Sequence, residues 1–263
     1  MRMSKREIWS RALGFVGTKI GRDRVDLLLA KIANSAAEYH SLSKVYERFC
    51  LSAENRAMVP NVIGWITDHP DMRDALSHFD LTMNRGWSEE DFYSRLTQMT
   101  ERGRQADLTR RNNLWRQYAK SLHDITSFLI PFDSPNGSSE SFFGYVGENC
   151  GSKEHAWSLA EEISHHIRGM GPPLVCDALK EIGVTNFAKP DTHIKYIFRR
   201  LGLCHGAGDR EVFYSVCDFA ENVNVMPSQV DKVFWLIGSG NFYMFRMAFG
   251  SLKAEFFDGL QRD

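Results

Sequence analysis

The chain has 263 residues, of which 43% are hydrophobic and 25% charged, and its 32 basic residues nearly balance its 33 acidic ones. This composition is ordinary for a folded protein of one large domain or two small lobes, and it excludes wholesale disorder. No apolar run approaches the roughly 20 residues that cross a bilayer, which excludes an integral membrane protein. The near-zero net charge, taken alone, argues against a nucleic-acid partner.

The N-terminus and the cysteines bear on the cellular compartment. The basic start at Arg2, Lys5 and Arg6 is followed by no long apolar stretch, so we expect no secretory signal. The five cysteines are widely scattered and form no C-x-x-C pair, so we expect reduced, mostly buried thiols and neither a zinc site nor an iron–sulfur cluster. A cytoplasmic location follows from these features.

The first half of the chain has a helical tendency but contains no motif with a nameable chemistry. Ser88 is a candidate N-cap, with Asp91 three residues later as in a capping box. The segment 131–139 is rich in Pro, Asn, Gly and Ser, which predicts a surface loop between helices.

The second half shows apolar residues at helical spacing. Four stripes follow this period, within residues 156–167, 174–182, 194–201 and 230–237. Because no sustained alternation of period two occurs, we predict an all-α fold. Gly183 and Gly202 are predicted to end helices, and Asp191 and Ser228 to begin them.

Basic residues are less evenly spread than the total suggests. Residues 1–24 carry seven against two acidic residues, and residues 101–120 carry six against two. A third group consists of Lys189, Lys195, Arg199 and Arg200. Charge runs are most often solvated faces, but if these groups converge on one side they supply a positive surface for phosphates despite the neutral total.

A glycine-rich hairpin between two predicted helices is the most informative segment. The first helix ends near Arg168, and Gly169 and Gly171 permit a tight reversal because glycine adopts unusual φ values at little cost. Pro172 and Pro173 preset the backbone for the first turn of the next helix. We expect free N–H groups at Gly171 and at the helix start to point outward, which makes an anion site without a charged side chain.

Asp191 follows Gly171 by twenty residues and comes directly after Pro190, at the start of the next predicted helix. A carboxylate at an N-cap is stabilised in its charged form by the helix dipole and by N–H donors. Either motif alone is more simply explained as structure, Asp191 as a cap and Gly-Met-Gly as a loop. A functional interpretation depends on their occurring together, in this order and at this spacing.

Together the hairpin and the aspartate resemble a divergent branch of the helix-hairpin-helix DNA glycosylase superfamily. The matching residues are Gly169-Met170-Gly171 and the loop Phe187-Ala-Lys-Pro-Asp191-Thr-His193. The twenty-residue interval is similar to that of endonuclease III-like and adenine-glycosylase-like members. The resemblance covers about 140–245, where Val233-Phe-Trp235-Leu-Ile-Gly238 is similar to a family helix that closes the cleft, and it fades upstream.

The resemblance implies an all-α protein with two helical lobes, a helix-hairpin-helix motif and an active-site cleft between the lobes. We expect an N-terminal helical region at 1–100 that packs partly on the second lobe. A helical-barrel lobe is expected at 101–190, with the motif at about 155–183, and a C-terminal helical lobe at 191–263. The protein is expected to be a monomer.

The resemblance also implies base excision. Asp191 is the expected catalytic residue, which stabilises an oxocarbenium-like sugar and activates a water once the nucleotide is flipped out of the duplex. The expected DNA-phosphate contacts are Gly169, Met170, Gly171, Lys189 and Lys195. Tyr145 and Trp235 are candidates for the base pocket, and the loop 133–139 is by position a candidate to fill the gap in the duplex.

Departures from the family restrict the expected reaction. Bifunctional members carry a lysine two residues after the second hairpin glycine, where it forms a Schiff base and nicks the strand, but this chain has Pro173 there. We therefore expect a monofunctional enzyme without lyase activity, with Lys189 and Lys195 as alternative amines. No iron–sulfur cluster, metal or other cofactor is expected, while a monovalent cation at the hairpin stays open.

The expected partner is double-stranded DNA with a damaged or modified base, with no membrane partner, and the expected location is cytoplasmic, at the nucleoid if the source is bacterial. Two alternatives stay open. One is a catalytically inactive protein of the same fold that binds bent or modified DNA. The other is an unrelated all-helical interaction domain whose hairpin packs against protein. The sequence does not decide which base is excised.

Overall fold

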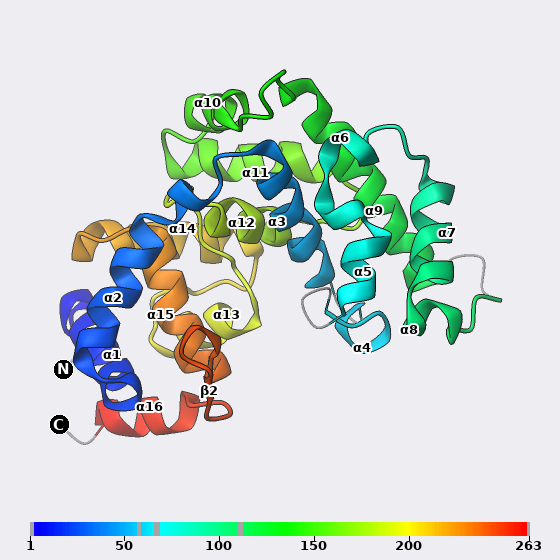
Figure 1. The fold of residues 1–263 in the computed structure, drawn as a ribbon. Helices are drawn as coiled ribbons and strands as arrows, with labels where there is room; N and C mark the ends of the chain where they lie inside the picture. The colour runs from blue at the N-terminus through cyan, green and yellow to red at the C-terminus, as the bar shows by residue number, and fades with distance from the viewer. Residues whose placement is uncertain (1–2, 57–58, 66–68, 110–112, 262–263) are drawn as a thin grey trace. The chain divides into compact units, whose positions relative to one another are not determined.

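Helices make up most of the structure (Figure 1). The computed structural model describes residues 3–56, 59–65, 69–109 and 113–261. Within these residues the strands are β1 (Asn241–Phe242) and β2 (Met247–Ala248), which form one antiparallel pair. The prediction of an all-α fold is therefore confirmed.

The chain divides into two compact units. The terminal unit consists of Met1–Ala36 and Gly183–Asp263, and the central unit consists of Ala37–Ile182. This division differs from the three consecutive segments expected from the sequence. The reason is that the first two helices pack against the C-terminal helices rather than joining the residues that follow them along the chain.

The terminal unit is built around buried aromatic rings. Its helices are α1 (Lys5–Ile20), α2 (Arg22–Ala33), α13 (Thr192–Arg200), α14 (Asp209–Val223), α15 (Pro227–Ser239) and α16 (Lys253–Gln261), with the short segment η5 (Tyr243–Phe245). The short segment η1 (Ser35–Glu38) contains the boundary to the central unit. Phe198, Phe219 and Phe234 lie with ring centroids 5.5, 5.7 and 5.8 Å apart, and Trp9 of α1 contacts two of them. Each such pair adds about 0.5–1.5 kcal/mol beyond area burial. Helix α13, which begins after Asp191, therefore packs on a well-filled core.

The central unit carries the hairpin. Its helices are α3 (Leu42–Glu54), α4 (Val59–Val62), α5 (Pro70–Ala75), α6 (Leu81–Asn84), α7 (Glu89–Met99), α8 (Glu101–Arg104), α9 (Leu114–Leu129), α10 (Glu140–Glu148), α11 (Lys153–His166) and α12 (Pro172–Glu181), with η3 (Ser77–Phe79) and η4 (Ile130–Phe132). Helix α9 packs against both α3 and α7, and the Tyr118 hydroxyl donates to the Cys50 carbonyl at 3.2 Å. Helix α12 packs along α3, which places the second hairpin helix on this core.

Local capping signals in the sequence correspond to the observed helix ends. Ser88 and Asp91 form the predicted capping box, with the Ser88 N–H donating to the Asp91 carboxylate at 2.7 Å and the Asp91 N–H to the Ser88 hydroxyl at 3.2 Å. Gly183 and Gly202 follow the ends of α12 and α13 with φ of +95° and +66°, which favour glycine. These predictions are confirmed.

The start of α15 corrects one prediction. Ser228 is not the N-cap, because α15 begins at Pro227, whose fixed φ suits the first helical position, and Met226 precedes it. The buried Ser228 hydroxyl has no hydrogen-bond partner within the described residues, but the Ser228 N–H donates to the Thr185 carbonyl at 3.1 Å. This bond joins α15 to the loop that leads to Asp191.

The predicted loop at 131–139 is present, although η4 occupies its first residues. The Leu42 N–H donates to the Gly137 carbonyl at 2.9 Å, and the Ser139 N–H donates to the His40 carbonyl at 3.2 Å. The loop is therefore fastened to the start of α3. The five cysteines form no disulfide within the described part of the chain, and four of them are buried.

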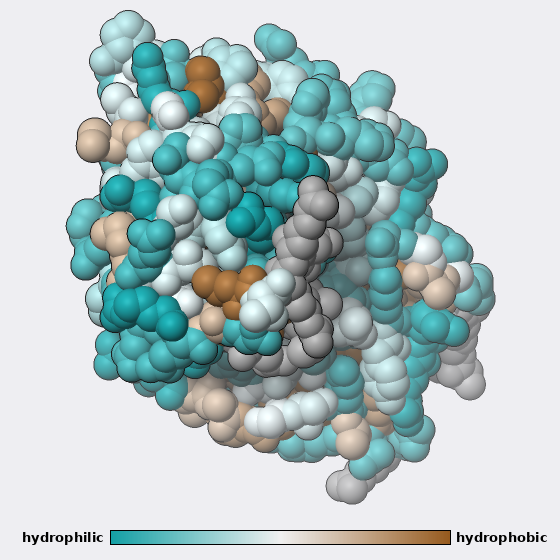
Figure 2. All heavy atoms as spheres, turned by 90° about the vertical axis from the view of Figure 1, so that its right-hand side faces the viewer, coloured by the Kyte–Doolittle hydropathy of each residue, from teal (hydrophilic) through white to brown (hydrophobic). Residues whose placement is uncertain are grey.

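The surface face in Figure 2 is covered mostly by hydrophilic side chains, with hydrophobic residues in small separate groups. No helix in the described part of the chain combines the length and the apolar character that a bilayer-spanning segment needs. Arg110 and Arg111, which belong to the second predicted basic group, lie outside the described residues.

Candidate active site

The hairpin spans the five residues between α11 and α12. Gly169 has φ +85°, which favours glycine, and a Cβ at this position would lie 2.7 Å from the Arg56 Nη1 atom and 2.9 Å from the Ser121 hydroxyl. Gly171 has φ −72° and ψ 169°, an ordinary extended conformation, with only the Pro173 side chain near its absent Cβ. The expectation that both glycines relieve unusual φ values therefore applies to Gly169 alone.

The hairpin has fewer free donors than the sequence suggested. Pro172 and Pro173 have no N–H, while the N–H groups of Leu174 and Val175 both donate to the Gly171 carbonyl, at 2.9 and 3.2 Å. The helix start thus offers no free donor, contrary to expectation, because its first turn is proline-rich and closes on Gly171. Within the described residues, the N–H groups of Gly169 and Gly171 have no acceptor.

Met170 contributes to the hairpin by anchoring it. Its side chain is 1% exposed, and its N–H donates to the Ile167 carbonyl at 3.2 Å. Neither group is directed to an external phosphate. Of the three hairpin residues predicted to bind phosphate, Gly169 and Gly171 have backbone N–H groups without an acceptor among the described residues, whereas Met170 is buried. Phosphate binding by the hairpin stays a prediction.

A set of ion pairs holds the start of the hairpin. Asp124 accepts hydrogen bonds from the Arg168 backbone N–H at 2.9 Å, from Nε at 2.6 Å and from Nη2 at 2.7 Å. The Arg168 guanidinium also pairs with Glu89, and the Ser121 hydroxyl donates to the Arg168 carbonyl at 2.6 Å. Burial opposes ionisation of Asp124, but the hydrogen bonds from Arg168 outweigh it and keep the pKa of this carboxyl below its usual value.

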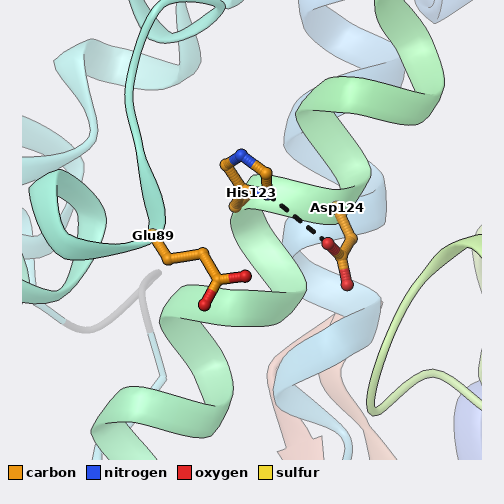
Figure 3. A group of neighbouring side chains, drawn as sticks. All are labelled: Glu89, His123 and Asp124. Atoms are coloured by element: carbon orange, nitrogen blue, oxygen red, sulfur yellow. Dashed lines mark hydrogen bonds and ion pairs between the residues drawn. The ribbon is translucent and has the colours of Figure 1, made fainter.

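The same carboxylates form an acid–histidine group of the kind that binds metals (Figure 3). Atoms of Glu89, His123 and Asp124 that are able to bind a metal lie within 4.8 Å of one another, and Figure 3 shows the Glu89 carboxylate reaching toward the two residues on α9. Hydrogen bonds to Asp124 raise the pKa of Arg168, which remains cationic beside these carboxylates. We therefore interpret the group as an ion-pair network that positions the hairpin.

Asp191 is the N-cap of α13, as predicted. Its Oδ1 atom accepts hydrogen bonds from the His193 N–H at 2.8 Å and the Ile194 N–H at 2.9 Å. The carboxylate is half-buried, and within the described residues its Oδ2 atom has no hydrogen-bond partner. One oxygen is thus fixed by the helix, and the other remains available to a substrate or a water.

The loop before Asp191 is held by α15. Phe187 and Ala188 are fully buried, and the Lys189 N–H donates to the carboxylate of Asp231, itself fully buried, at 3.2 Å. The Asp191 N–H donates to the Lys189 carbonyl at 2.8 Å, which turns the chain immediately before the cap. These contacts fix the backbone that presents the Asp191 side chain.

An aromatic contact joins the first turn of α13 to α15. The His193 ring lies edge-on to Trp235 at a centroid distance of 6.4 Å, and Trp235 contacts Tyr243 at 6.1 Å. A Cβ on Gly238 would lie 2.6 Å from the His193 Cβ, so glycine at 238 lets this side chain pack on α15. Burial lowers the pKa of His193, which favours its neutral form.

The remaining predicted site residues are placed as follows. Tyr145 lies on α10 of the central unit, where its hydroxyl donates to Glu162 at 2.9 Å, while Trp235 belongs to the terminal unit. Lys195 pairs with Asp209, so its charge is already compensated. The hairpin and Asp191 likewise belong to different units, each with its own supporting contacts.

Several residues at these sites carry no signal in the sequence. Arg56, Ser121 and Asp124 come from α9 and from the end of α3, far from the hairpin along the chain, and Asp231 reaches the Asp191 loop from α15. They lie beside the motifs only because the helices pack together. Spacing rules that find a hairpin and a cap do not find such residues.

Comparison with known proteins identifies the fold. No protein-family model matches the sequence, and a search of curated proteins gives no significant match. Among solved structures, the Methanocaldococcus jannaschii 8-oxoguanine glycosylase/lyase in complex with 15mer DNA containing 8-oxoguanine aligns with a TM-score of 0.56 and 13% identity, over 88% of this chain and 96% of that one. The 8-oxoguanine DNA glycosylase of Thermotoga maritima aligns with a TM-score of 0.52 and 13% identity, over 87% and 95% of the two chains. This chain therefore has the fold of these glycosylases along most of its length.

Proposed function

We propose that this protein is a DNA glycosylase of the helix-hairpin-helix superfamily that removes a damaged or modified base by hydrolysis and leaves an abasic site. The observation that carries the proposal is the Asp191 carboxylate, whose Oδ1 is fixed by two backbone donors while Oδ2 has no partner among the described residues. The shared fold supports it, because the solved structures that align with this chain are 8-oxoguanine DNA glycosylases. The glycine hairpin of this chain, through which its sequence resembles the superfamily, supports it as well.

The chemistry follows from the charge of Asp191. Cleavage of the bond between C1′ and the base leaves positive charge on the sugar, and a fixed carboxylate stabilises that charge more than it stabilises the neutral substrate. Oδ2 accepts a proton from the attacking water, whose oxygen then bonds to C1′. The departing base leaves with its electron pair and takes up a proton, so that the products are a free base and an abasic sugar.

Hydrolysis without strand cleavage is the proposed outcome. Pro173 occupies the position of the lysine that forms a Schiff base in bifunctional members, and proline has no primary amine. Lys195 is paired with Asp209, which reduces its availability as a nucleophile. The relative from M. jannaschii is described as a glycosylase/lyase, so the proposed reaction differs from that relative's second activity.

We further propose the partner, the oligomeric state and the location in which this reaction takes place. The partner is double-stranded DNA that contains the modified base, the protein acts as a monomer in the cytoplasm, and no iron–sulfur cluster or other cofactor takes part. In this setting recognition depends on extrusion of the base, because contacts to phosphates carry no sequence information.

The test is a panel of duplexes that each contain one modified base, 8-oxoguanine among them, together with hypermodified phage DNA. Each duplex is incubated with the protein, treated with alkali and examined for strand breaks. We expect breaks after alkali only, and Asp191→Asn is expected to abolish them. Asp258→Asn is the matched control, because it removes the same charge from an exposed position in the same unit.

Three results would contradict the proposal in different ways. Full activity of Asp191→Asn would refute the assigned mechanism. Breaks without alkali, with trapping of the protein by borohydride, would show a lyase. Duplex binding without release of any base from the panel would favour the catalytically inactive DNA-binding protein.

A further inference from the structure

Two arginines, Arg168 and Arg56, lie at the hairpin, and they differ in whether an acidic residue pairs with them. Arg168 is paired with both Asp124 and Glu89, so its guanidinium offers little net charge to an external anion. Arg56 has no acidic partner within the described residues, although its guanidinium lies against Gly169. The positive charge at this hairpin therefore resides on Arg56.

The position of Arg56 is set by the packing of α3 on α12. At the end of α3, the Ser52 hydroxyl and the Asn55 side-chain amide donate to Asp177 of α12, at 3.0 and 3.2 Å. Asp177 is 6% exposed, so these bonds form in the interior, where they tie the two helices together. Arg56 follows Asn55 directly, and its Nη1 atom lies 2.7 Å from the point that a Cβ on Gly169 would occupy.

The hairpin alone is a poor anion site. Two backbone N–H groups, those of Gly169 and Gly171, are without an acceptor in the described structure, because Pro172 and Pro173 remove two of the donors that a helix start normally provides. A phosphate has more acceptor sites than two donors satisfy, and a guanidinium beside the loop supplies both charge and a planar pair of donors.

We propose that Arg56 is a side-chain ligand of the DNA phosphate that the hairpin holds, acting with the N–H groups of Gly169 and Gly171. The inference rests on the proposed function, because it assumes that the hairpin contacts DNA. It assigns to the end of α3 a role that neither the sequence motif nor the shared fold indicates.

The experiment measures duplex affinity against salt concentration. The probe is a short duplex with a tetrahydrofuran abasic-site analogue, and Kd is obtained by fluorescence anisotropy over a series of KCl concentrations. The variants are Arg56→Ala and Arg56→Lys. Lys44→Ala is the control, since it removes an exposed positive charge, one that is paired with Glu47, from the other end of α3, about 15 Å of helix away.

Loss of one phosphate contact lowers the slope of log K against log salt by about 0.9. We expect this change for Arg56→Ala, with affinity at low salt about tenfold weaker or more, because a charge-assisted hydrogen bond is lost. Arg56→Lys is expected to keep most of the slope but not all of the affinity, since lysine retains the charge and loses the planar pair of donors. Lys44→Ala should match the wild type.

A purely structural role for Arg56 predicts another outcome. Arg56→Ala would then lower the thermal melting temperature and leave the salt slope unchanged, which would overturn the inference. If a bound alkali cation supplies the charge instead, Arg56→Ala would bind like the wild type, and replacement of potassium by tetramethylammonium at constant ionic strength would weaken binding.

The inference and the proposed function fail in distinguishable ways. If the wild type shows no salt-dependent binding to duplex DNA, both are refuted. If the wild type binds the analogue and releases no base, only the proposed function is refuted, and the slope of Arg56→Ala still decides the inference. If the wild type releases a base and Arg56→Ala keeps the full slope, only the inference is refuted.

Discussion

The two hairpin glycines are expected to differ sharply in their tolerance of alanine. Gly169 has φ +85°, and an added Cβ there would meet Arg56 Nη1 at 2.7 Å and the Ser121 hydroxyl at 2.9 Å. Gly171 has φ −72°, and the nearest atom to an added Cβ is the Pro173 Cδ at 3.8 Å, an ordinary van der Waals contact. Gly169→Ala and Gly171→Ala therefore form a matched pair within one loop.

The magnitude for Gly169→Ala follows from two costs. An L-residue with a side chain in the left-handed region costs about 1–2 kcal/mol. Displacement of the Ser121 hydroxyl breaks its 2.6 Å hydrogen bond to the Arg168 carbonyl, which costs about 1 kcal/mol, whereas the flexible end of Arg56 moves cheaply. We expect a loss of about 2–3 kcal/mol for Gly169→Ala.

For Gly171→Ala the opposing effects nearly cancel. Alanine restricts the unfolded chain and so stabilises the native state by about 0.4–1 kcal/mol at a compatible position. Alanine is also a poorer N-cap than glycine, which offsets that gain. We expect a net change of less than about 1 kcal/mol.

Equilibrium urea unfolding of the two variants beside the wild type measures this difference. Gly169→Ala should also weaken duplex binding, because the displaced Arg56 leaves the hairpin, while Gly171→Ala should retain it. A loss for Gly171→Ala as large as that for Gly169→Ala would refute the reasoning from backbone conformation. So would a Gly169→Ala variant within about 0.5 kcal/mol of the wild type.

Two further predictions concern pH. Arg168 holds the pKa of Asp124 below the unfolded value of about 3.9, so this stabilisation is present above that pH and is lost as the pH falls through the folded pKa. Asp124→Asn should lower the free energy of unfolding by about 2 kcal/mol at neutral pH. It should also reduce the fall of this free energy at acidic pH, measured by urea unfolding over a series of pH values, and an unchanged fall would contradict the assignment. Burial lowers the pKa of His193 below about 6.5, so the unfolded chain binds this proton first, and stability falls as the pH drops below that value. His193→Asn should reduce this dependence between pH 5 and 7, and an imidazole titration by NMR at or above 6.5 would disprove the assignment.

Local chemistry explains which features are predictable from the sequence. The N-cap at Asp191 and the capping box at Ser88 are formed with backbone N–H groups two or three positions away. The helix ends before Gly183 and Gly202 depend on the conformation of the glycine itself. Such signals survive in a single sequence because no tertiary contact is needed to produce them. The prediction of Ser228 as an N-cap was wrong because the neighbouring Pro227 is a stronger signal for the start of a helix than a serine.

The residues that support the sites depend on tertiary packing. Arg168 and Asp124 are separated by 44 residues, and Ser52 and Asp177 by 125, so only the packing of α9 and α3 brings them together. The same reason explains the unit boundaries, because α1 contacts the C-terminal helices through Trp9 and α2 packs on α15, and neither contact has a periodic signature in the sequence. The hairpin is predictable as a motif from its glycines. The number of its free N–H donors is not, because it depends on the hydrogen bonds that Leu174 and Val175 donate to Gly171.

The near-zero net charge of the chain reflects ion pairs between individual basic and acidic residues. Several basic residues near the predicted DNA contacts are compensated: Arg168 by Asp124 and Glu89, Arg116 by Glu90 and Lys195 by Asp209. These paired residues offer little net charge to a duplex, so we expect a shallow salt slope in which each remaining phosphate contact, such as that of Arg56, accounts for about 0.9. Weak attraction to undamaged DNA makes affinity depend on the extruded base, since phosphate contacts do not distinguish one base from another. We thus expect the modified base, and not the net charge, to determine where this protein resides on DNA.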